Sequence, residues 1–301
     1  MNERDILIVG AGTAGLTAAI YVQRAGRHAV LFEKSAPGGQ IVTANEIQNY
    51  PGFVSVNGAD FAYRLYDQAV RLGAEFLSEE VLEIIPADHS VTVRTAAGTR
   101  TGRALIYAAG ASHRRLGLPE EEKLIGKGIS FCANCDGAFF RDKRVAVNGG
   151  GNTALDDAVY LSRMASEVYL IHRRKEYRAE EALQKQIAEI GNIHPILDTV
   201  ITGLKENDGH LSGLRLQNKD SGEETELAAE GLFLAIGMKP ETGLLKGIVK
   251  LDDAGYIIAS EDTRTDVPNI FAAGDVRKKQ VRQLTTAAAD GTAAAIQAVS
   301  L

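Results

Sequence analysis

The sequence predicts an α/β protein in which one strand–turn–helix–strand unit occurs twice. The first copy has an apolar run at 5–9, a glycine turn at 10–15, an apolar-periodic stretch at 16–25 and a second apolar run at 29–32. The second copy repeats this order from Arg144 onward. Short apolar runs alternating with helical periodicity are typical of parallel sheets in α/β folds. We therefore expect two related nucleotide-binding units.

The first glycine turn has the spacing Gly-x-Gly-x-x-Gly, at Gly10, Gly12 and Gly15. Alone this pattern is weak, because glycine-rich turns are common and can be purely structural. Here the turn follows a strand and opens a helix, and Glu33 closes the second strand about 20 residues further on. The glycines let the backbone approach a pyrophosphate at the helix N-terminus, and Glu33 can accept hydrogen bonds from a ribose. This pattern predicts a dinucleotide site.

The stretch between the two copies predicts loops, a helix and strands. Residues 38–40 and 49–52 are rich in turn residues, so we expect loops over the top of the sheet or ordinary surface loops. Residues 61–72 read as an amphipathic helix and residues 91–94 as part of a strand. An apolar strand follows at 105–110 and ends in glycine, where the backbone must pass close to another group.

The second copy differs from the first where its second strand ends. A strand at 144–147, a glycine turn at 149–154, a helix at 155–164 and a strand at 167–171 are followed by His172. Two arginines come next, Arg173 and Arg174, and Arg178 lies one helical turn further on. Arginines at this position accommodate a 2′-phosphate, whereas an acidic residue selects a free 2′-hydroxyl. A solvated basic edge is the alternative, but the position relative to the turn favours NADPH over NADH.

The last segment has a strand at 270–275 that ends in Gly-Asp and an Ala-rich helix at 285–299. An aspartate at a strand end can bind a polyol hydroxyl, and a helix N-terminus can stabilise negative charge on a reduced ring system. Without the rest of the sequence, this segment would read as a packing helix.

The only two cysteines of the chain, Cys132 and Cys135, are separated by two residues and followed by Asp136. Two thiols at this spacing can close a small disulfide ring, in which one thiolate attacks an incoming disulfide and the other resolves the mixed disulfide. Half of a zinc site is an alternative, although no other cysteine and no suitably spaced histidine completes it. A structural bridge is another. Because we find no N-terminal signal peptide, we expect a reducing, cytoplasmic compartment, where structural disulfides are rare.

Composition restricts the partners. The chain has 301 residues, of which 45% are hydrophobic, enough for about two domains with their own cores. Its formal net charge of -6 argues against a nucleic-acid partner. We expect no membrane insertion, because no apolar run approaches the roughly 20 residues needed to cross a bilayer.

Taken together, these motifs resemble those of the small, homodimeric bacterial thioredoxin reductases. The resemblance runs in order over nearly the whole chain, through the segments 10–15, 38–40, 132–137, 149–154, 172–178, 273–275 and 282–283. It implies an FAD domain formed by residues 1–113 and 243–301, with an inserted NADPH domain at 117–239 that carries the dithiol. Both domains would be Rossmann-like, and the glycines and prolines at the two crossings suit hinges.

The resemblance also implies the site residues. For FAD they are Gly10, Gly12, Ala14, Gly15, Glu33, Lys34, Gly39, Gln40, Asn49, Val81, Gly110, Gly274, Asp275, Arg282 and Gln283. For NADPH they are Gly149, Gly151, Asn152, Thr153, His172, Arg173, Arg174 and Arg178. No metal site is implied.

The implied reaction is the reduction of thioredoxin by NADPH through FAD and the dithiol. Cys135 would lie beside the flavin, Cys132 would attack the thioredoxin disulfide, and Asp136 would protonate a leaving thiolate. Since the nicotinamide and the dithiol lie on one domain and both need the flavin, that domain is expected to rotate between half-reactions.

Two alternatives remain open. A reductase of the same fold could serve another disulfide acceptor, such as a peroxiredoxin or a glutaredoxin-like protein. A nonenzymatic redox sensor or flavin-binding scaffold with a zinc half-site shared across a dimer would instead contain stoichiometric metal and no flavin.

Overall fold

The computed structural model of the chain describes residues 5–44 and 46–301 and divides into two compact units. Unit 1 consists of Met1–Ser112 with Lys239–Leu301, and unit 2 of His113–Met238. The crossings run through β8 (Ala111–His113) and β17 (Met238–Pro240), which are hydrogen-bonded neighbours in a two-stranded sheet. The predicted α/β class is confirmed.

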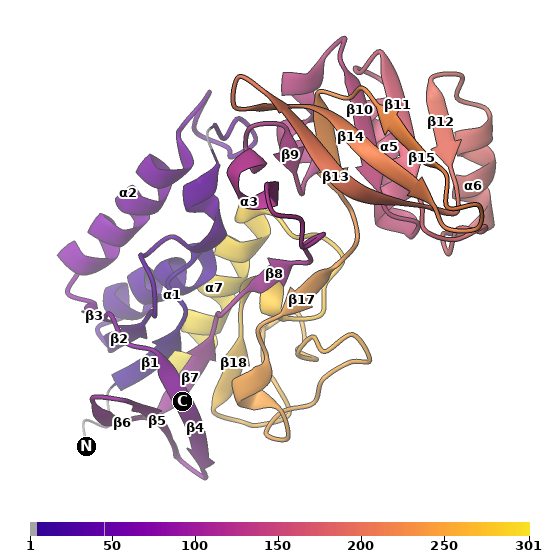
Figure 1. Ribbon diagram of the computed structural model, residues 1–301. Helices are drawn as coiled ribbons and strands as arrows, with labels where there is room; N and C mark the ends of the chain where they lie inside the picture. The colour runs from indigo at the N-terminus through magenta and orange to yellow at the C-terminus, as the bar shows by residue number, and fades with distance from the viewer. Residues whose placement is uncertain (1–4, 45) are drawn as a thin grey trace. The chain divides into compact units, whose positions relative to one another are not determined.

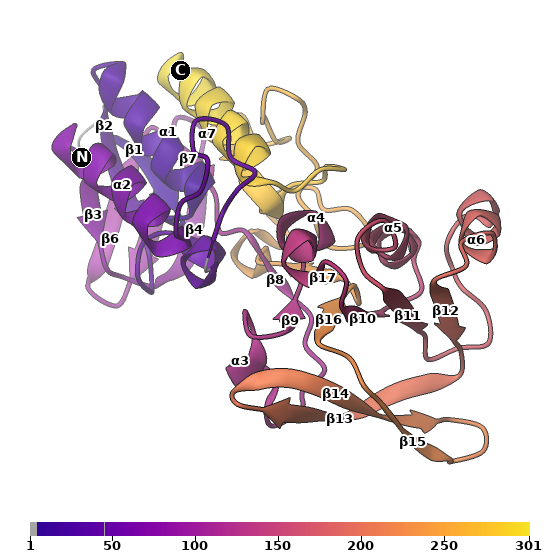
Figure 2. The same cartoon turned by 90° about the horizontal axis from the view of Figure 1, so that it is seen from above.

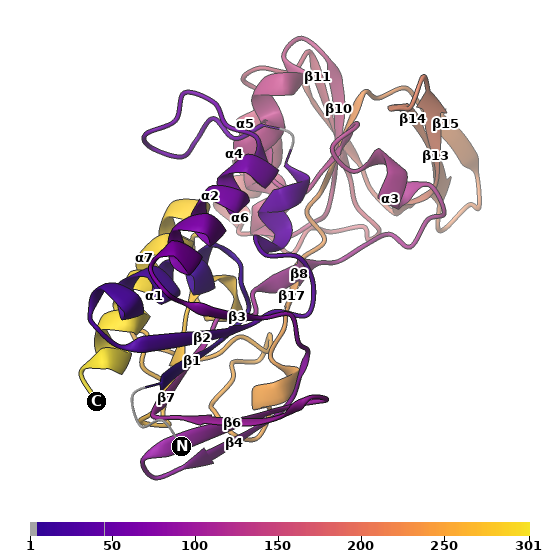
Figure 3. The same cartoon turned by 90° about the vertical axis from the view of Figure 1, so that its left-hand side faces the viewer.

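Unit 1 is built on a parallel sheet with the strand order β18-β7-β1-β2-β3. Its strands are β18 (Ile270–Ala272), β7 (Ala104–Tyr107), β1 (Asp5–Val9), β2 (His28–Phe32) and β3 (Glu75–Leu77). Three helices, α1 (Thr13–Arg24), α2 (Gly58–Arg71) and α7 (Leu284–Val299), lie on one face of this sheet (Figure 3). The other face is covered by an antiparallel sheet of β4 (Val81–Ala87), β5 (Ser90–Thr95) and β6 (Gly98–Gly102).

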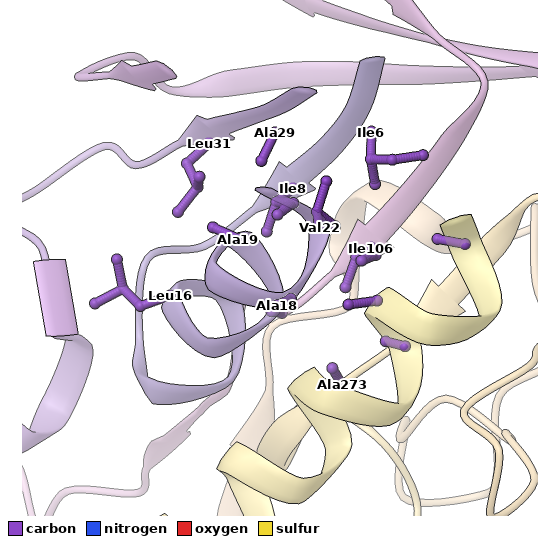
Figure 4. Close-up of a cluster of buried hydrophobic side chains, with 14 of the residues drawn as sticks. Ile6, Ile8, Leu16, Ala18, Ala19, Val22, Ala29, Leu31, Ile106 and Ala273 are labelled. Atoms are coloured by element: carbon purple, nitrogen blue, oxygen red, sulfur yellow. The ribbon is translucent and has the colours of Figure 1, made fainter. Parts of the chain in front are cut away.

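This layering follows from the alternation of side chains along each buried strand. In β1, Ile6 and Ile8 pack against the helices, whereas Leu7 and Val9 pack against the antiparallel sheet. Because both faces are covered, the central strands are mostly apolar rather than alternating between apolar and polar residues. Figure 4 shows the helix-side cluster around Ile8.

Small residues bring the C-terminal helix close to α1. A Cβ on Gly291 of α7 would lie 2.2 Å from the carbonyl oxygen of Ala14 in α1, so only glycine fits there. Ala294 and Ala298 continue the contact and are fully buried. The Ala-rich composition of α7 therefore serves close helix packing, and it brings the C-terminal segment to the first glycine turn.

Unit 2 repeats the plan with a parallel sheet in the order β12-β11-β10-β16-β9. Its strands are β12 (Ile193–Ile196), β11 (Glu167–Ile171), β10 (Arg144–Asn148), β16 (Gly231–Leu234) and β9 (Ile129–Ser130). Figure 2 shows α4 (Ala133–Asp136), α5 (Asn152–Leu161) and α6 (Glu181–Ala188) on one face, and the antiparallel strands β13 (Thr199–Asn207), β14 (His210–Asn218) and β15 (Glu224–Leu227) on the other. The short helix α3 (Glu121–Leu124) precedes β9, as Figure 1 shows. The described residues also form four 3-10 segments, η1 (Gly39–Thr43), η2 (Gly137–Phe140), η3 (Gly243–Leu245) and η4 (Gly274–Val276).

Some element bounds differ from those that periodicity predicts. Helix α1 begins at Thr13, inside the glycine turn, rather than at the first apolar residue of the pattern, Leu16. Helix α2 begins earlier than 61 because the Asn57 side chain accepts a hydrogen bond from the Ala59 N–H and caps it. Helix α5 ends at Leu161 rather than at 164. Among the described residues, no helix combines the length and the apolar character needed to cross a membrane.

Candidate active site

The cysteine pair lies at the start of α4 in unit 2, where Cys132 and Cys135 are joined in a disulfide. One helical turn brings the two residues together, with 5.3 Å between their Cα atoms. The carbonyl oxygen of Cys132 accepts hydrogen bonds from the N–H groups of Cys135 (3.2 Å) and Asp136 (3.1 Å). Ala133 is fully buried in the core and anchors the turn. Both cysteines are half-buried, so the pair sits at the edge of the core rather than inside it.

Asp136 is held next to this disulfide by a serine. Its Oδ2 accepts a hydrogen bond of 2.6 Å from the hydroxyl of Ser130, the last residue of β9. Burial raises the pKa of Asp136 above its ordinary value, and the hydrogen bond from Ser130 partly offsets that rise. A carboxyl group with a raised pKa keeps its proton to higher pH and can give it up to a leaving thiolate.

The ring of Phe131, the residue before Cys132, contacts two side chains that lie at or just after the first crossing. The ring of His113 stacks on it with centroids 4.4 Å apart, and the guanidinium of Arg115 lies 4.8 Å from its centroid. Burial, with a smaller contribution from the charge of Arg115, lowers the pKa of His113 to about 4. The imidazole is therefore neutral at pH 7.

The glycine turn of unit 1 has the shape that a pyrophosphate needs. A Cβ on Gly10 would lie 2.4 Å from the carbonyl oxygen of Ala108, and one on Gly15 would lie 1.9 Å from that of Gly10, so both positions require glycine. A Cβ on Gly12, by contrast, would have the carbonyl oxygen of Gly38 as its nearest neighbour, 4.0 Å away. Gly12 is also the N-cap of α1 and places no side chain over the helix end. The helix N-terminus is thus open to an anion.

Glu33 directly follows β2 and folds back to this turn. Its Oε2 accepts the N–H of Ala11 at 2.9 Å, and its Oε1 accepts the N–H of Ser35 at 2.9 Å. These bonds hold the carboxylate beside the glycine turn while lone pairs on both oxygens remain for ribose hydroxyls.

The C-terminal segment adds polar groups to the same unit. Gly274 packs against Ala14, where a Cβ would lie 2.9 Å from the Ala14 Cβ. Asp275 Oδ1 is buried and accepts no hydrogen bond from the described part of the chain, although the Lys279 ammonium lies 3.5 Å away. Burial raises the pKa of Asp275. Arg282 Nε is likewise buried without a hydrogen-bond partner among the described residues. Orphaned donors and acceptors of this kind fit a polar ligand.

The residues predicted for FAD all belong to unit 1 but do not all share one environment. Gly39 lies against Gly12, where an added Cβ would lie 3.2 Å from the Gly12 Cα. Asn49 donates a 3.3 Å hydrogen bond to Gln283, which caps α7. The side chain of Val81 is packed in the core, so only its backbone is free to meet a ligand. The remaining predicted residues are Lys34, which is exposed, Gln40, which bonds the carbonyl of Ala111, and Gly110, which has a positive φ of 72°.

The second glycine turn, in unit 2, reproduces the first. A Cβ on Gly149 would lie 2.5 Å from the carbonyl oxygen of Ala235, whereas a Cβ on Gly151 would have nothing within 4 Å. Gly151 is the N-cap of α5 and leaves its N-terminus uncovered by a capping side chain. Asn152 and Thr153 form the exposed first turn of that helix.

His172 occupies in unit 2 the place that Glu33 has in unit 1, but its ring points inward. The side chain is 5% exposed and lies under Gly150, where an added Cβ would come within 2.2 Å of the imidazole. The Tyr177 ring stacks on the imidazole of His172 with their centroids 5.6 Å apart. The Nε2 atom of His172 has no hydrogen-bond partner among the described residues. Burial lowers the pKa of His172. The imidazole therefore supports the glycine turn as a neutral group.

The exposed basic residues after His172 form a pocket. Its volume is about 290 Å³, and it is lined by Arg174, Lys175, Glu176, Tyr177 and Arg178. The Tyr177 hydroxyl is buried without a hydrogen bond from the described residues, and burial raises its pKa to about 12. Arg173 is exposed beside the pocket but does not line it. A cationic pocket with an unpaired hydroxyl, next to an open helix N-terminus, suits a phosphorylated ribose.

The sequence motifs do not indicate several residues that lie next to the site. Ser130 and Phe131 had no local signal other than their place before the first cysteine. Asp290 binds the N–H of Gly274 from helix α7, and the sequence offers nothing to pair them. Among the described residues, no group of three or more histidine, cysteine, aspartate or glutamate side chains is arranged to hold a metal ion.

Comparison with known proteins adds to this geometry. The pyridine nucleotide-disulphide oxidoreductase family matches residues 4–291. A thioredoxin reductase of Treponema pallidum is 41% identical to the chain, with 99% of this chain and 97% of the relative covered. One of Listeria monocytogenes is 39% identical, with 95% and 90% covered. The crystal structure of thioredoxin reductase from Streptococcus pyogenes has a TM-score of 0.94 at 37% identity, over 99% of this chain and 98% of that one.

Proposed function

Because the chain belongs to the pyridine nucleotide-disulphide oxidoreductases and, within them, to the thioredoxin reductases, we propose that it reduces the disulfide of thioredoxin with electrons from NADPH. It is an oxidoreductase that uses FAD and NADPH. One observation carries the assignment: a disulfide with an adjacent half-buried carboxyl group lies in the same unit as an arginine-lined nucleotide pocket. The full activity is that of an NADPH-dependent thioredoxin-disulfide reductase.

The FAD domain proposed at 1–113 and 243–301 overlaps unit 1 except for His113, and the residues of unit 1 fit FAD. The open space at Gly12 receives the pyrophosphate at the N-terminus of α1, and Glu33 receives the adenosine ribose. Polar groups of FAD would supply the hydrogen-bond partners that Asp275 Oδ1 and Arg282 Nε do not find among the described residues. When bound, FAD supplies a carrier that takes two electrons from NADPH and passes them to the disulfide.

The NADPH domain proposed at 117–239 overlaps unit 2 except for Lys239, and the residues of unit 2 fit NADPH in the same way. Gly151 leaves room for the pyrophosphate, and Arg174 and Arg178 with Arg173 nearby offer charge to the 2′-phosphate. His172 acts here by supporting the turn, because its buried ring does not line the pocket.

The dithiol then carries two electrons to the partner protein. The thiolate of Cys132 attacks one sulfur of the thioredoxin disulfide, which forms a mixed disulfide and releases a thiolate that Asp136 protonates. The thiolate of Cys135 next attacks the sulfur of Cys132, which releases the second thioredoxin thiolate and restores the Cys132–Cys135 disulfide. The half-buried position of both cysteines is compatible with attack from outside the fold.

Three further expectations belong to this proposal. Unit 2 rotates relative to unit 1 between half-reactions, which is supported by the presence of both the dithiol and the nucleotide pocket within His113–Met238. The protein acts as a homodimer and in the cytoplasm, as the resemblance implies.

The test is an anaerobic titration of the FAD-loaded protein with NADPH, followed by the flavin absorbance. NADPH bleaches the flavin, and oxidised thioredoxin added afterwards restores the colour. In Cys135→Ser the flavin is still bleached, but thioredoxin no longer restores it. NADH serves as the control donor and bleaches poorly. If NADPH leaves the flavin oxidised, or if Cys135→Ser reduces thioredoxin normally, the proposed relay is wrong.

A further inference from the structure

We propose that Ser130 is a positioning residue that holds the carboxyl group of Asp136 against the dithiol in both of its protonation states. The inference rests on the proposed function, in which Asp136 protonates a leaving thiolate. The Ser130 hydroxyl lies between the Asp136 carboxyl group and the backbone of Cys132, and all these atoms belong to unit 2.

Within the described part of the chain, the Ser130 hydroxyl has three hydrogen-bond contacts, and each of them involves the site. Its Oγ donates to Asp136 Oδ2 at 2.6 Å. The same oxygen accepts the N–H of Cys132 at 3.1 Å, and the Cys132 carbonyl oxygen lies 3.4 Å away as a second acceptor for the hydroxyl proton. Ser130 is 4% exposed, so bulk water does not compete strongly for these contacts.

The strand and the helix on either side keep the two residues in place. Ser130 pairs with Phe233 in the parallel ladder between β9 and β16. Asp136 ends α4, and Gly137 follows it in a tight contact where an added Cβ would lie 3.1 Å from both Leu161 and Tyr160. The hydroxyl and the carboxyl group thus come from two rigidly packed segments, and their 2.6 Å contact is a property of the fold.

A hydroxyl can serve both forms of a titrating acid because it donates and accepts. When Asp136 is ionised, Ser130 donates its proton to the carboxylate. When Asp136 is protonated, its O–H donates to Ser130 Oγ, and the serine proton turns to the Cys132 carbonyl oxygen 3.4 Å away. Ser130 itself neither gains nor loses a proton, whereas an alanine would leave the buried carboxyl group without this partner in either form.

The proton step that benefits is simple. The O–H bond of the Asp136 carboxyl group breaks and an S–H bond forms on the leaving thiolate, so that a neutral acid and a thiolate become a carboxylate and a thiol. The new carboxylate is stabilised at once by the Ser130 hydroxyl, which rotates without moving any heavy atom. Ser130 therefore lowers the cost of the charged product and keeps the acid aimed at the dithiol.

The test is the pH dependence of kcat/KM for thioredoxin in the FAD-loaded enzyme with Ser130→Ala. The rate falls at least about tenfold, since a hydrogen bond to a charged group is lost. Its alkaline limb moves to higher pH, because loss of the Ser130 hydrogen bond leaves burial to raise the pKa of Asp136 further. The variants Ser130→Thr and Ser130→Val form a second pair. Their side chains have the same shape and differ only in the hydroxyl group, so steric strain from the larger side chain affects both variants. Threonine retains the wild-type profile, and valine reproduces that of alanine.

A readout independent of turnover follows the Asp136 carboxyl group directly in the oxidised enzyme, by infrared titration of its protonated C=O band with Asp136→Asn as the assignment control. Ser130→Ala shifts this titration upward and Ser130→Thr does not. Equal profiles for the Thr and Val variants, or an unmoved titration in Ser130→Ala, would overturn the inference. Failure of the wild-type enzyme to reduce thioredoxin would overturn the proposed function instead, while the infrared titration would still decide the role of Ser130.

Discussion

Asn152 and Glu180 are joined by two hydrogen bonds that tie the two halves of the nucleotide site in unit 2 together. Asn152 Oδ1 accepts the backbone N–H of Glu180 at 2.9 Å, and its Nδ2 donates to Glu180 Oε1 at 3.0 Å. The N–H of Arg178 donates to the carbonyl of Gly150 at 2.7 Å in the same region. The arginine segment and the glycine turn are therefore held in one relative position before any ligand binds, which reduces the ordering cost of binding.

Glu180→Ala weakens NADPH binding although Glu180 does not line the pocket. One of the two hydrogen bonds to Asn152 is lost, and an exposed bond of this kind corresponds to about a threefold rise in the dissociation constant. Glu180→Gln keeps an acceptor for Asn152 and retains wild-type affinity. Calorimetric titration with NADP+ measures both variants. Equal weakening by glutamine and alanine would show that charge, and not this contact, matters.

Alanine substitutions in the first glycine turn separate FAD binding from folding. Gly12→Ala places its Cβ in the open space at the N-terminus of α1, so the protein folds but loses FAD affinity by about tenfold or more. Gly15→Ala would put its Cβ 1.9 Å from the Gly10 carbonyl oxygen, so it destabilises the unit itself. Flavin content and the circular dichroism of both variants decide the matter. A flavin-saturated Gly12→Ala would contradict the pyrophosphate assignment.

The sequence could predict the strand–turn–helix geometry of these turns for a physical reason. Gly10, Gly15 and Glu33 act through backbone conformation and short-range order along the chain, which a motif records. The contacts of Ser130 with Asp136 and of Asp290 with Gly274 depend on how a strand or a helix packs, and no spacing in the sequence encodes that. His172 was predicted as a ligand residue from its position after the strand, but the direction of its ring depends on Gly150 and Tyr177.

A buried charge cluster in unit 1 predicts a large loss of stability for Asp290→Asn. Asp290 accepts hydrogen bonds from Arg277 at 2.8 and 2.9 Å and from Lys279 at 3.1 Å. Removing its charge leaves the buried Arg277 without its carboxylate partner and, among the described residues, leaves Lys279 only its 3.5 Å ion pair with Asp275, for which we expect a loss of about 3–5 kcal/mol in the free energy of unfolding. Asp262→Asn, which breaks an exposed pair with Arg264, is the matched control and costs under about 1 kcal/mol. Urea denaturation compares them, and similar losses would contradict the prediction.

The same cluster gives an acid-sensitive contribution to wild-type stability. Burial alone would raise the pKa of Asp290, but the hydrogen bond from Arg277 and the charge of Lys279 outweigh it and hold the pKa below the ordinary value of 3.8. A carboxyl group with a lowered folded-state pKa stabilises the fold above its unfolded value and loses this contribution as the pH falls through the folded value. Asp290→Asn should therefore differ most from the wild type above about pH 4 and converge with it in stronger acid.

His113 also makes the fold less stable in acid, through a proton that only the unfolded chain takes up, and His113→Phe should remove this effect. Its folded-state pKa is lowered to about 4 from the ordinary 6.5, so below pH 6.5 the unfolded chain binds a proton that the folded chain refuses. Wild-type stability therefore declines as the pH falls from 6.5 to about 4, by at most about 3 kcal/mol. Phenylalanine keeps the stack on Phe131 and removes the titrating group, so the variant loses less stability over this range. His210→Gln, which replaces an exposed histidine of the same unit, is the matched control. Urea midpoints between pH 7 and pH 4 measure all three proteins, and a slope in His113→Phe as steep as that of the wild type would mean that His113 is not the group responsible.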